Sequence, residues 1–150
     1  SIHVNAEPGP TAWGLETYAL DTASDAGAAR VAARENTLAR QLGAGEGTEP
    51  LLARLLVTGM NHLSRDLAAE VQSHAVRRLR DAYGPAPIRD LGPKTALFTV
   101  LVATRMPAVL FESGFLTNAE EERRLRSPQY QRLTAASLAE AVLAFLDRGE

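Results

Sequence analysis

The apolar residues of this 150-residue chain recur with two different periods, which predict both strands and helices. Short apolar or alternating stretches predict strands at residues 1–4, 14–20, 97–103 and 108–111. The last two stretches are almost continuously apolar. That composition favours strands that are buried on both faces of a sheet.

Longer stretches with a helical period predict helices between and after these strands. They cover residues 28–42, 50–58, 62–83, 119–126 and 128–147. Strands that alternate with helices in this way predict an α/β layered domain. The predicted sheet is lopsided, and the chain opens abruptly inside a strand at Ser1, so we expect further N-terminal strands to be missing.

The composition narrows the classes of protein and partner. A hydrophobic fraction of 45% suffices for the core of one domain. The 16 basic and 18 acidic residues give a net charge of −2 without a basic block, which argues against nucleic acid as a partner. The longest apolar runs fall far short of the ~20 residues that span a bilayer, so we expect no membrane span. The chain has no cysteine, which excludes disulfides and thiolate metal sites.

Two residues at the ends of predicted strands are candidates for metal chemistry. His3 lies directly before a loop, where a neutral imidazole makes a good zinc ligand, although a lone histidine is more often not a ligand. Glu112 follows the apolar run 108–111, and open α/β sheets place their sites at the carboxyl ends of strands. Burial there would raise its pKa and make it a base toward a metal-bound water. The alternative for Glu112 is a salt bridge with Arg105 or a role as a helix cap.

Glu35 is unexpected for its position in the first predicted helix. At about 100° per residue it falls in the middle of the arc that Val31, Leu38 and Leu42 define. A carboxylate on the apolar face of a helix is costly unless a cation pairs with it. We therefore expect Glu35 to meet a cation, either an arginine or a zinc ion.

Several sequence blocks, taken together, resemble a known family of enzymes. The blocks are Ser-Ile-His-Val-Asn-Ala at 1–6, Gly-Leu-Glu-Thr-Tyr at 14–18, Met-Pro-Ala-Val-Leu-Phe-Glu-Ser-Gly-Phe-Leu-Thr-Asn at 106–118 and the glutamates at 120–122. Their order and separation are similar to those of the N-acetylmuramoyl-L-alanine amidases of the AmiA/AmiB/AmiC type, the Amidase_3 family. The resemblance covers essentially the whole chain.

The resemblance implies a fold, a reaction and roles for two residues. The fold would be a mixed, twisted β-sheet flanked by helices. The enzymes are zinc hydrolases that cleave the amide between N-acetylmuramic acid and L-alanine in peptidoglycan, in the periplasm or cell envelope, during cell-wall remodelling and daughter-cell separation. His3 would correspond to the last zinc ligand of the family. Glu112 would correspond to the catalytic glutamate that activates the zinc-bound water.

The resemblance also implies a form of regulation. Residues from about 24 to 60 look like the helical insertion of the cell-division members, in which a helix packs across the active site until an activator protein displaces it. Glu35 would then be a zinc ligand in the inhibited state only. This hypothesis explains a carboxylate at an apolar position of the helix.

The chain departs from the family pattern in its metal ligands. The family supplies a first histidine and a glutamate ligand from N-terminal segments, and nothing of that kind precedes His3. A catalytic zinc site normally takes three protein ligands. We therefore expect this chain to be the C-terminal portion of one catalytic domain in a longer protein, and to be inactive when isolated.

Two other functions fit parts of the sequence. The first is a catalytically incomplete amidase-like module that binds an activator or the cell wall. The missing ligands favour this module, whereas the presence of both His3 and Glu112 favours the enzyme. The second is a zinc carboxypeptidase, which the ligand chemistry allows but which lacks an arginine to clamp a substrate carboxylate.

Overall fold

The computed structural model describes residues 1–41, 61–102 and 104–148. The strands are β1 (Ile2–Asn5), β2 (Leu15–Leu20), β3 (Asp90–Ala96) and β4 (Val109–Phe115). The helices are α1 (Ala26–Gln41), α3 (Asn61–Tyr83), α4 (Thr99–Val102), α5 (Ala119–Leu125) and α6 (Pro128–Asp147). The predicted helix at 50–58 lies outside the described residues.

The strands form one mixed sheet in the order β1-β4-β2-β3. Strand β4 lies inside the sheet, parallel to β1 and antiparallel to β2, while β2 is parallel to β3. Glu112 of β4 is the Cα partner of His3 on one side and of Glu16 on the other. Because residues that lie opposite one another in a sheet share a face, this register places three polar side chains in one row.

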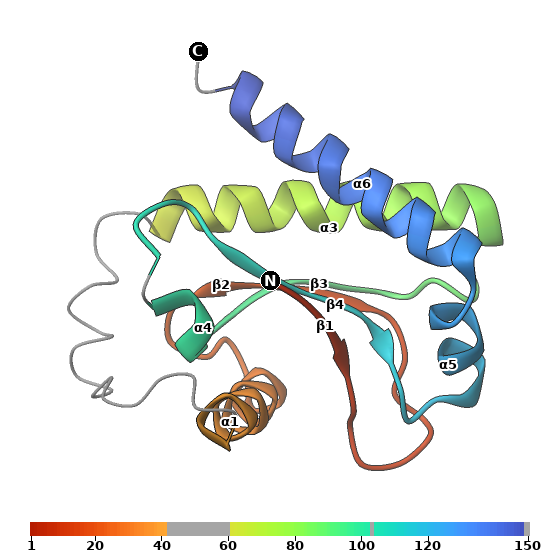
Figure 1. Cartoon of the computed structure of the whole chain (residues 1–150), viewed down its shortest axis with the longest axis horizontal. Helices are drawn as coiled ribbons and strands as arrows, with labels where there is room; N and C mark the ends of the chain where they lie inside the picture. The colour runs from red at the N-terminus through yellow and green to blue at the C-terminus, as the bar shows by residue number, and fades with distance from the viewer. Residues whose placement is uncertain (42–60, 103, 149–150) are drawn as a thin grey trace.

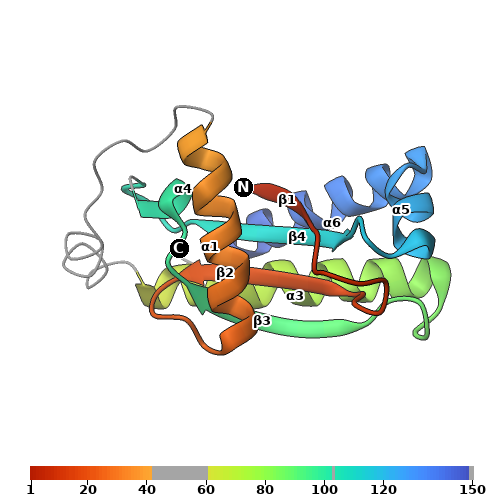
Figure 2. The ribbon, with the colours of Figure 1, turned by 90° about the horizontal axis from the view of Figure 1, so that it is seen from below.

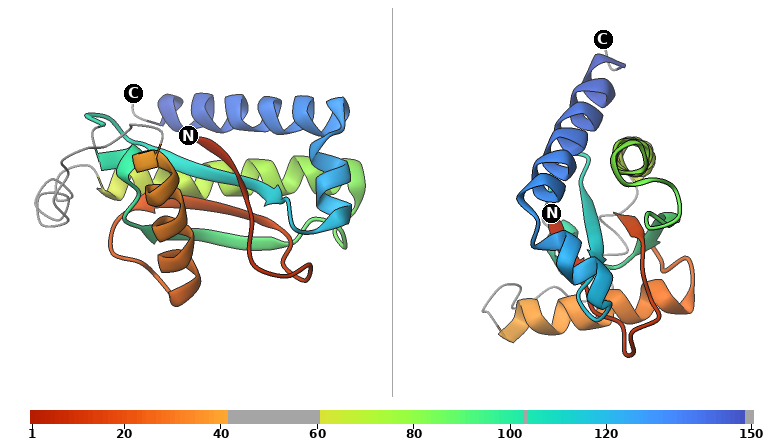
Figure 3. Two further views of the ribbon diagram at one scale, coloured as in Figure 1. Left: turned by 60° about the horizontal axis from the view of Figure 1, so that its bottom comes forward. Right: turned by 90° about the vertical axis from the view of Figure 1, so that its right-hand side faces the viewer.

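Helices cover both faces of the sheet. Helices α3 and α6 pack on one face, and α1 and the short α4 lie on the other (Figures 1 and 3). A core cluster on the α3 side includes Leu15, Val71, Leu79 and Phe111, and a second cluster on the α1 side includes Tyr18, Val31, Phe98 and Leu110. The predicted α/β fold, with a mixed sheet flanked by helices, is confirmed.

The predicted strand at 97–103 was wrong, because part of this apolar run forms helix α4. Phe98, Leu101 and Val102 are buried while Val100 is half exposed, which is the spacing of one helical turn. The side chain of Asn36 holds the turn at its start, accepting from the N–H of Thr99 and donating to the carbonyl of residue 97. This cap comes from another helix and has no signal within the run itself.

Strand β3 escaped prediction because its sequence, Asp-Leu-Gly-Pro-Lys-Thr-Ala, contains both Gly92 and Pro93. Proline lacks an N–H for the ladder and is tolerated in edge strands. Strand β3 lies at one edge of the described sheet, which is where a strand tolerates a proline that cannot donate an N–H.

The connection after β4 is fixed by two side chains. Asn118 caps α5 as the sequence predicts, since its side-chain oxygen accepts from the N–H groups of Glu120 and Glu121. The buried carboxylate of Glu121 accepts from the N–H groups of Gly14 and Phe115. Glu121 thus connects the start of β2 to the end of β4, which are two of the strands that carry the polar row.

Candidate metal centre

Three acidic and imidazole side chains from three different elements meet on the α1 side of the sheet. His3 comes from β1, Glu112 from β4 and Glu35 from α1, and one ligand atom of each lies within 4.8 Å of the others. The sequence singled out all three residues. The structure places them around one point, which is the geometry that a single cation requires.

Both ring nitrogens of His3 have a partner. Nδ1 lies 2.8 Å from Oε2 of Glu35, and Nε2 lies 2.8 Å from the hydroxyl oxygen of Ser1. A neutral imidazole offers one N–H and one lone pair. These contacts fit the tautomer in which Nδ1–H donates to the Glu35 carboxylate and the Ser1 hydroxyl donates to Nε2. A metal ion in place of the Nδ1 proton would have one donor atom from His3 and one from Glu35, so the two residues fit a pair of metal ligands.

The Glu112 carboxylate is fully buried, and neither of its oxygens has a hydrogen-bond partner among the described residues. Burial raises its pKa to about 8, the negative charges of Glu35 and Glu16 add to this effect, and the positive charge of Arg34 opposes it. The salt bridge with Arg105 and the helix cap that the sequence left open are therefore absent from the described structure.

A divalent cation fits this donor set. Imidazole nitrogen and carboxylate oxygen are ligands that zinc takes in proteins, and the buried, unpaired oxygens of Glu112 lack the compensation that such groups normally have. A positive charge at the centre of the cluster would relieve both the burial and the mutual repulsion of the carboxylates.

The raised pKa of Glu112 predicts a pH-dependent stability of the metal-free protein. The folded chain holds the Glu112 proton up to about pH 8, whereas the ordinary value of 4.5 applies on unfolding. Between these values the folded state binds more protons, so the contribution of Glu112 to stability is largest below about pH 4.5 and falls as the pH rises toward 8. We expect a loss on the order of 3 kcal/mol from about pH 5 to about pH 8, and a flatter profile for Glu112→Gln. Urea unfolding in the presence of a chelator measures both, and equal slopes would refute the assignment.

Helix α1 is held against the site through two consecutive residues. Glu35 contacts His3, and the guanidinium of Arg34 donates 2.7 Å to the carbonyl of Ala6 and 2.8 Å to Oδ1 of Asn5. Arg34 also lies 3.3 Å from Oε1 of Glu35. The expected cation partner of Glu35 is thus an arginine in this structure, and the His3 imidazole is a second polar contact of the same carboxylate.

A buried polar network next to the cluster was not predicted. The carboxylate of Glu16 accepts from Asn5 Nδ2 at 3.1 Å, from the Tyr18 hydroxyl at 2.7 Å and from Lys94 Nζ at 2.7 Å. Glu16 is only 5% exposed. The one signal in the sequence is a glutamate inside a strand whose neighbours are apolar or β-forming. It indicates a buried charge but not its partners.

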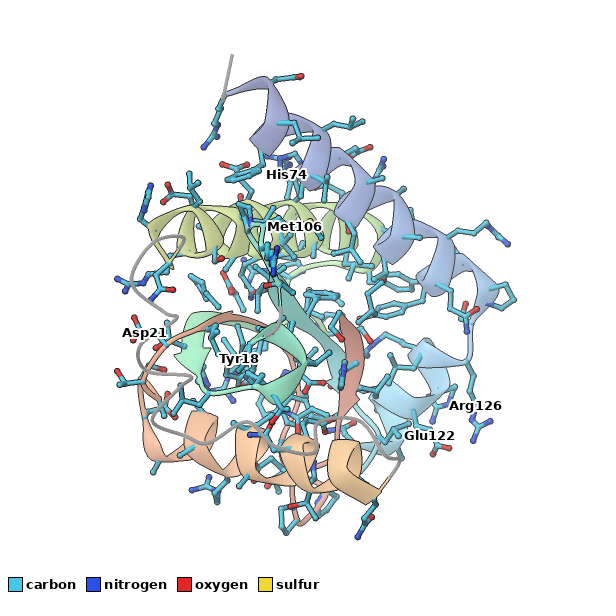
Figure 4. The ribbon with its side chains drawn as sticks, turned by 60° about the vertical axis from the view of Figure 1, so that its left-hand side comes forward. Tyr18, Asp21, His74, Met106, Glu122 and Arg126 are labelled. Carbon is cyan, nitrogen blue, oxygen red and sulfur yellow. The ribbon has the colours of Figure 1, made fainter. Side chains whose placement is uncertain are left out.

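The other two histidines of the chain lie away from this site. His62 is exposed at the start of α3, and His74 lies on α3 beside Glu70 and Arg77. Figure 4 shows His74 on the α3 and α6 side of the sheet, opposite α1. They have no part in the cluster.

Fold and site together define the class: a mixed α/β domain that carries a histidine and two glutamates in an arrangement suited to a divalent cation. The chain belongs to the N-acetylmuramoyl-L-alanine amidase family, Amidase_3, whose profile matches residues 1–144. It is 28% identical over 149 residues to the N-acetylmuramoyl-L-alanine amidase AmiA of Escherichia coli strain K12, a match that covers 97% of this chain and 50% of AmiA.

Solved amidase structures share the fold. The crystal structure of an N-acetylmuramoyl-L-alanine amidase from Clostridium difficile 630 superposes with a TM-score of 0.63 at 30% identity, covering 98% of this chain and 56% of that one. The CwlD amidase of Clostridioides difficile, solved in complex with the GerS lipoprotein, shares the fold at 17% identity and a TM-score of 0.57, with 98% and 53% covered.

The chain spans about half the length of the curated relative AmiA. Of the helices that the structure describes, none combines the length and apolar character that crossing a membrane requires.

Proposed function

We propose that this chain is the C-terminal portion of a zinc-dependent amidase that hydrolyses the bond between N-acetylmuramic acid and L-alanine in peptidoglycan. The observation that carries the proposal is the buried Glu112 carboxylate, without a hydrogen-bond partner in the described structure and within 4.8 Å of a His3 nitrogen. Membership in the amidase family supports the choice of substrate. The enzyme would act in the periplasm or cell envelope, in cell-wall remodelling and daughter-cell separation.

The residues of the cluster would have different roles in the reaction. His3 would hold the zinc ion, with the remaining ligands supplied from outside this chain. Zinc supplies a Lewis acid that polarises a carbonyl and makes water more acidic. Glu112 would accept the proton of the attacking water and pass it to the departing amine, which requires its ionised form. A neighbouring cation favours that form, so Glu112 would be a base at neutral pH despite its burial.

We further propose that residues from about 24 to 60 form a regulatory insertion and that Glu35 is a zinc ligand of the inhibited state. Residues 42–60 of this insertion lie outside the described residues. Helix α1 runs across the face of the sheet that carries His3 and Glu112 (Figure 2). The Glu35 carboxylate lies next to His3, at the position where a water or a substrate carbonyl would have to bind. An activator protein that displaces α1 would open the site. The structure of the relative CwlD in complex with the GerS lipoprotein supports a second protein as a partner of this fold.

The alternative is a catalytically incomplete amidase-like module that binds an activator or the cell wall. The observation in its favour is the ligand set, because the cluster offers only His3 and Glu35 as ligands if Glu112 is the base. A catalytic zinc site normally takes three protein ligands and leaves a position for water.

One comparison separates the two functions. We expect the isolated 150-residue chain to release no stem peptide from purified peptidoglycan, because its ligand set is incomplete. The longest native product, meaning the longest natural polypeptide that contains this chain, should contain one zinc per chain. It should release peptides with an amino-terminal L-alanine, and a chelator should abolish this release. A native product without zinc or hydrolysis would favour the binding module. Activity of the isolated chain would refute the incomplete ligand set.

A further inference from the structure

The contact between α1 and the end of β1 uses two acceptors, one on the last residue of β1 and one on the residue that follows it. Arg34 Nη2 donates 2.8 Å to Oδ1 of Asn5, and Arg34 Nη1 donates 2.7 Å to the carbonyl oxygen of Ala6. The guanidinium is thus held by a side-chain oxygen and a main-chain oxygen of consecutive residues. Its neighbour Glu35 contacts His3, two residues earlier on the same strand. Two consecutive residues of α1 therefore contact two adjacent places on β1 and the residue after it: Glu35 contacts His3, and Arg34 contacts Asn5 and Ala6.

The acceptors are fixed without any help from α1. Asn5 is fully buried, its Nδ2 donates to Glu16 at 3.1 Å, and its Oδ1 also accepts from the N–H of Ala6 at 2.7 Å. Glu16 is in turn held by the Tyr18 hydroxyl and Lys94 Nζ. The network therefore sets which way the amide of Asn5 points, and its oxygen faces the guanidinium because its nitrogen is engaged on the other side.

Departure of α1 would leave these two oxygens without the guanidinium. Asn5 Oδ1 would keep the bond from the Ala6 N–H, and the lone pairs that Arg34 had engaged would be free to accept from water or from a donor group of a ligand. The position lies beside His3 and Glu112, where the proposed function places the scissile amide. A substrate bound there has several donors next to that bond, on the stem peptide and on the sugar.

We propose that Asn5 Oδ1 and the Ala6 carbonyl form a donor-binding subsite for the substrate, and that Arg34 occupies this subsite as a stand-in for a substrate N–H or O–H group. The inference rests on the proposed function and extends it. Arg34 and Glu35 together occupy two places that a substrate would fill. The Glu35 carboxylate lies where a metal ligand would bind, and the Arg34 guanidinium lies where a hydrogen-bond donor of the substrate would bind. Asn5 is then a specificity-determining residue, and Glu16 positions it.

The experiment measures binding in the metal-free, longest native protein, so that hydrolysis has no part in it. Arg34→Ala removes the stand-in, and Arg30→Ala is the matched control, since Arg30 lies on the same helix with an exposed side chain whose ion pair goes to Glu7. The probes are a free stem tripeptide with an amino-terminal L-alanine and, separately, N-acetylmuramic acid. Calorimetry gives the affinities, and NMR shifts of the Asn5 side-chain amide and the Ala6 carbonyl locate the bound probe.

We expect Arg34→Ala to bind one of the probes about five- to tenfold more tightly than the wild type or Arg30→Ala, with shifts at Asn5 and Ala6. Tighter peptide binding assigns the donor to the stem peptide, and tighter sugar binding assigns it to the glycan. The double variant Arg34→Ala/Asn5→Ala should lose the gain. If that variant fails to fold, the shifts in Arg34→Ala alone decide.

Equal affinities of Arg34→Ala and Arg30→Ala for both probes, without shifts at Asn5 and Ala6, would overturn the subsite. A failure of the proposed function gives a different pattern. In that case the native protein would not hydrolyse peptidoglycan, whatever the binding experiment shows. A gain in affinity without hydrolysis would support the subsite and reject the enzyme.

Discussion

Glu112→Gln is expected to reduce peptidoglycan hydrolysis by the longest native protein about 10³-fold, within the ~10²–10⁴-fold range of general acid–base catalysis. Glutamine has nearly the same shape but cannot accept the proton of the attacking water. The wild-type carboxylate is buried without a hydrogen-bond partner in the described part of the chain, so the substitution breaks no hydrogen bond there. Release of peptides with an amino-terminal L-alanine from purified peptidoglycan measures the effect.

A matched control separates this effect from a general change in charge. Glu122→Gln removes a carboxylate from α5, where Glu122 pairs with Arg126 at the surface (Figure 4). We expect this variant to keep wild-type activity. The zinc content of Glu112→Gln should equal that of the wild type, because Glu112 is the base and not a ligand of the active enzyme. If Glu112→Gln kept full activity with zinc bound, the role of Glu112 as the base would be wrong.

The second large effect is a gain of activity. Glu35→Ala removes the carboxylate that lies 2.8 Å from His3 Nδ1, and with it one of the contacts that hold α1 over the site. We expect the basal hydrolysis of the longest native protein, without an activator, to rise about tenfold, which corresponds to ~1.4 kcal/mol of lost preference for the inhibited state. Addition of an activator should then increase the rate less than it does for the wild type.

The control for this variant weakens α1 elsewhere. Glu7→Ala removes the carboxylate that lies 3.9 Å from Arg30 of α1, in a contact that includes no member of the cluster. An equal gain from both variants would mean that any loosening of α1 opens the site. Unchanged basal activity of Glu35→Ala would count against Glu35 as the inhibitory ligand.

The sequence predicts the members of the cluster because each stands out locally. His3 and Glu112 are polar residues in or next to short apolar strands, and Glu35 is a carboxylate on an apolar arc. Their meeting point depends on the order β1-β4-β2-β3 and on the pairing of His3 with Glu112. The family resemblance implied that these two residues share a site, whereas strand register follows from tertiary packing and could not come from periodicity alone.

The network that orients Asn5 could not be predicted, for the same physical reason. Glu16 and Lys94 are 78 positions apart, and Arg34 and Asn5 are 29 positions apart, with strand β2 between them in the chain. Only the fold brings these charges together. The short helix α4 and the edge strand β3 show the same limit, because a cap from Asn36 and an edge position overrode the local preferences.

The proposed mechanism requires that His3 and Glu112 face each other across a single divalent cation. Anomalous diffraction at the zinc edge, from crystals of the longest native protein grown with zinc, locates this cation. We expect one peak at bonding distance from the His3 imidazole, with the Glu112 carboxylate pointing toward it. A zinc peak elsewhere, or none at a cluster whose three side chains keep their positions, would contradict it.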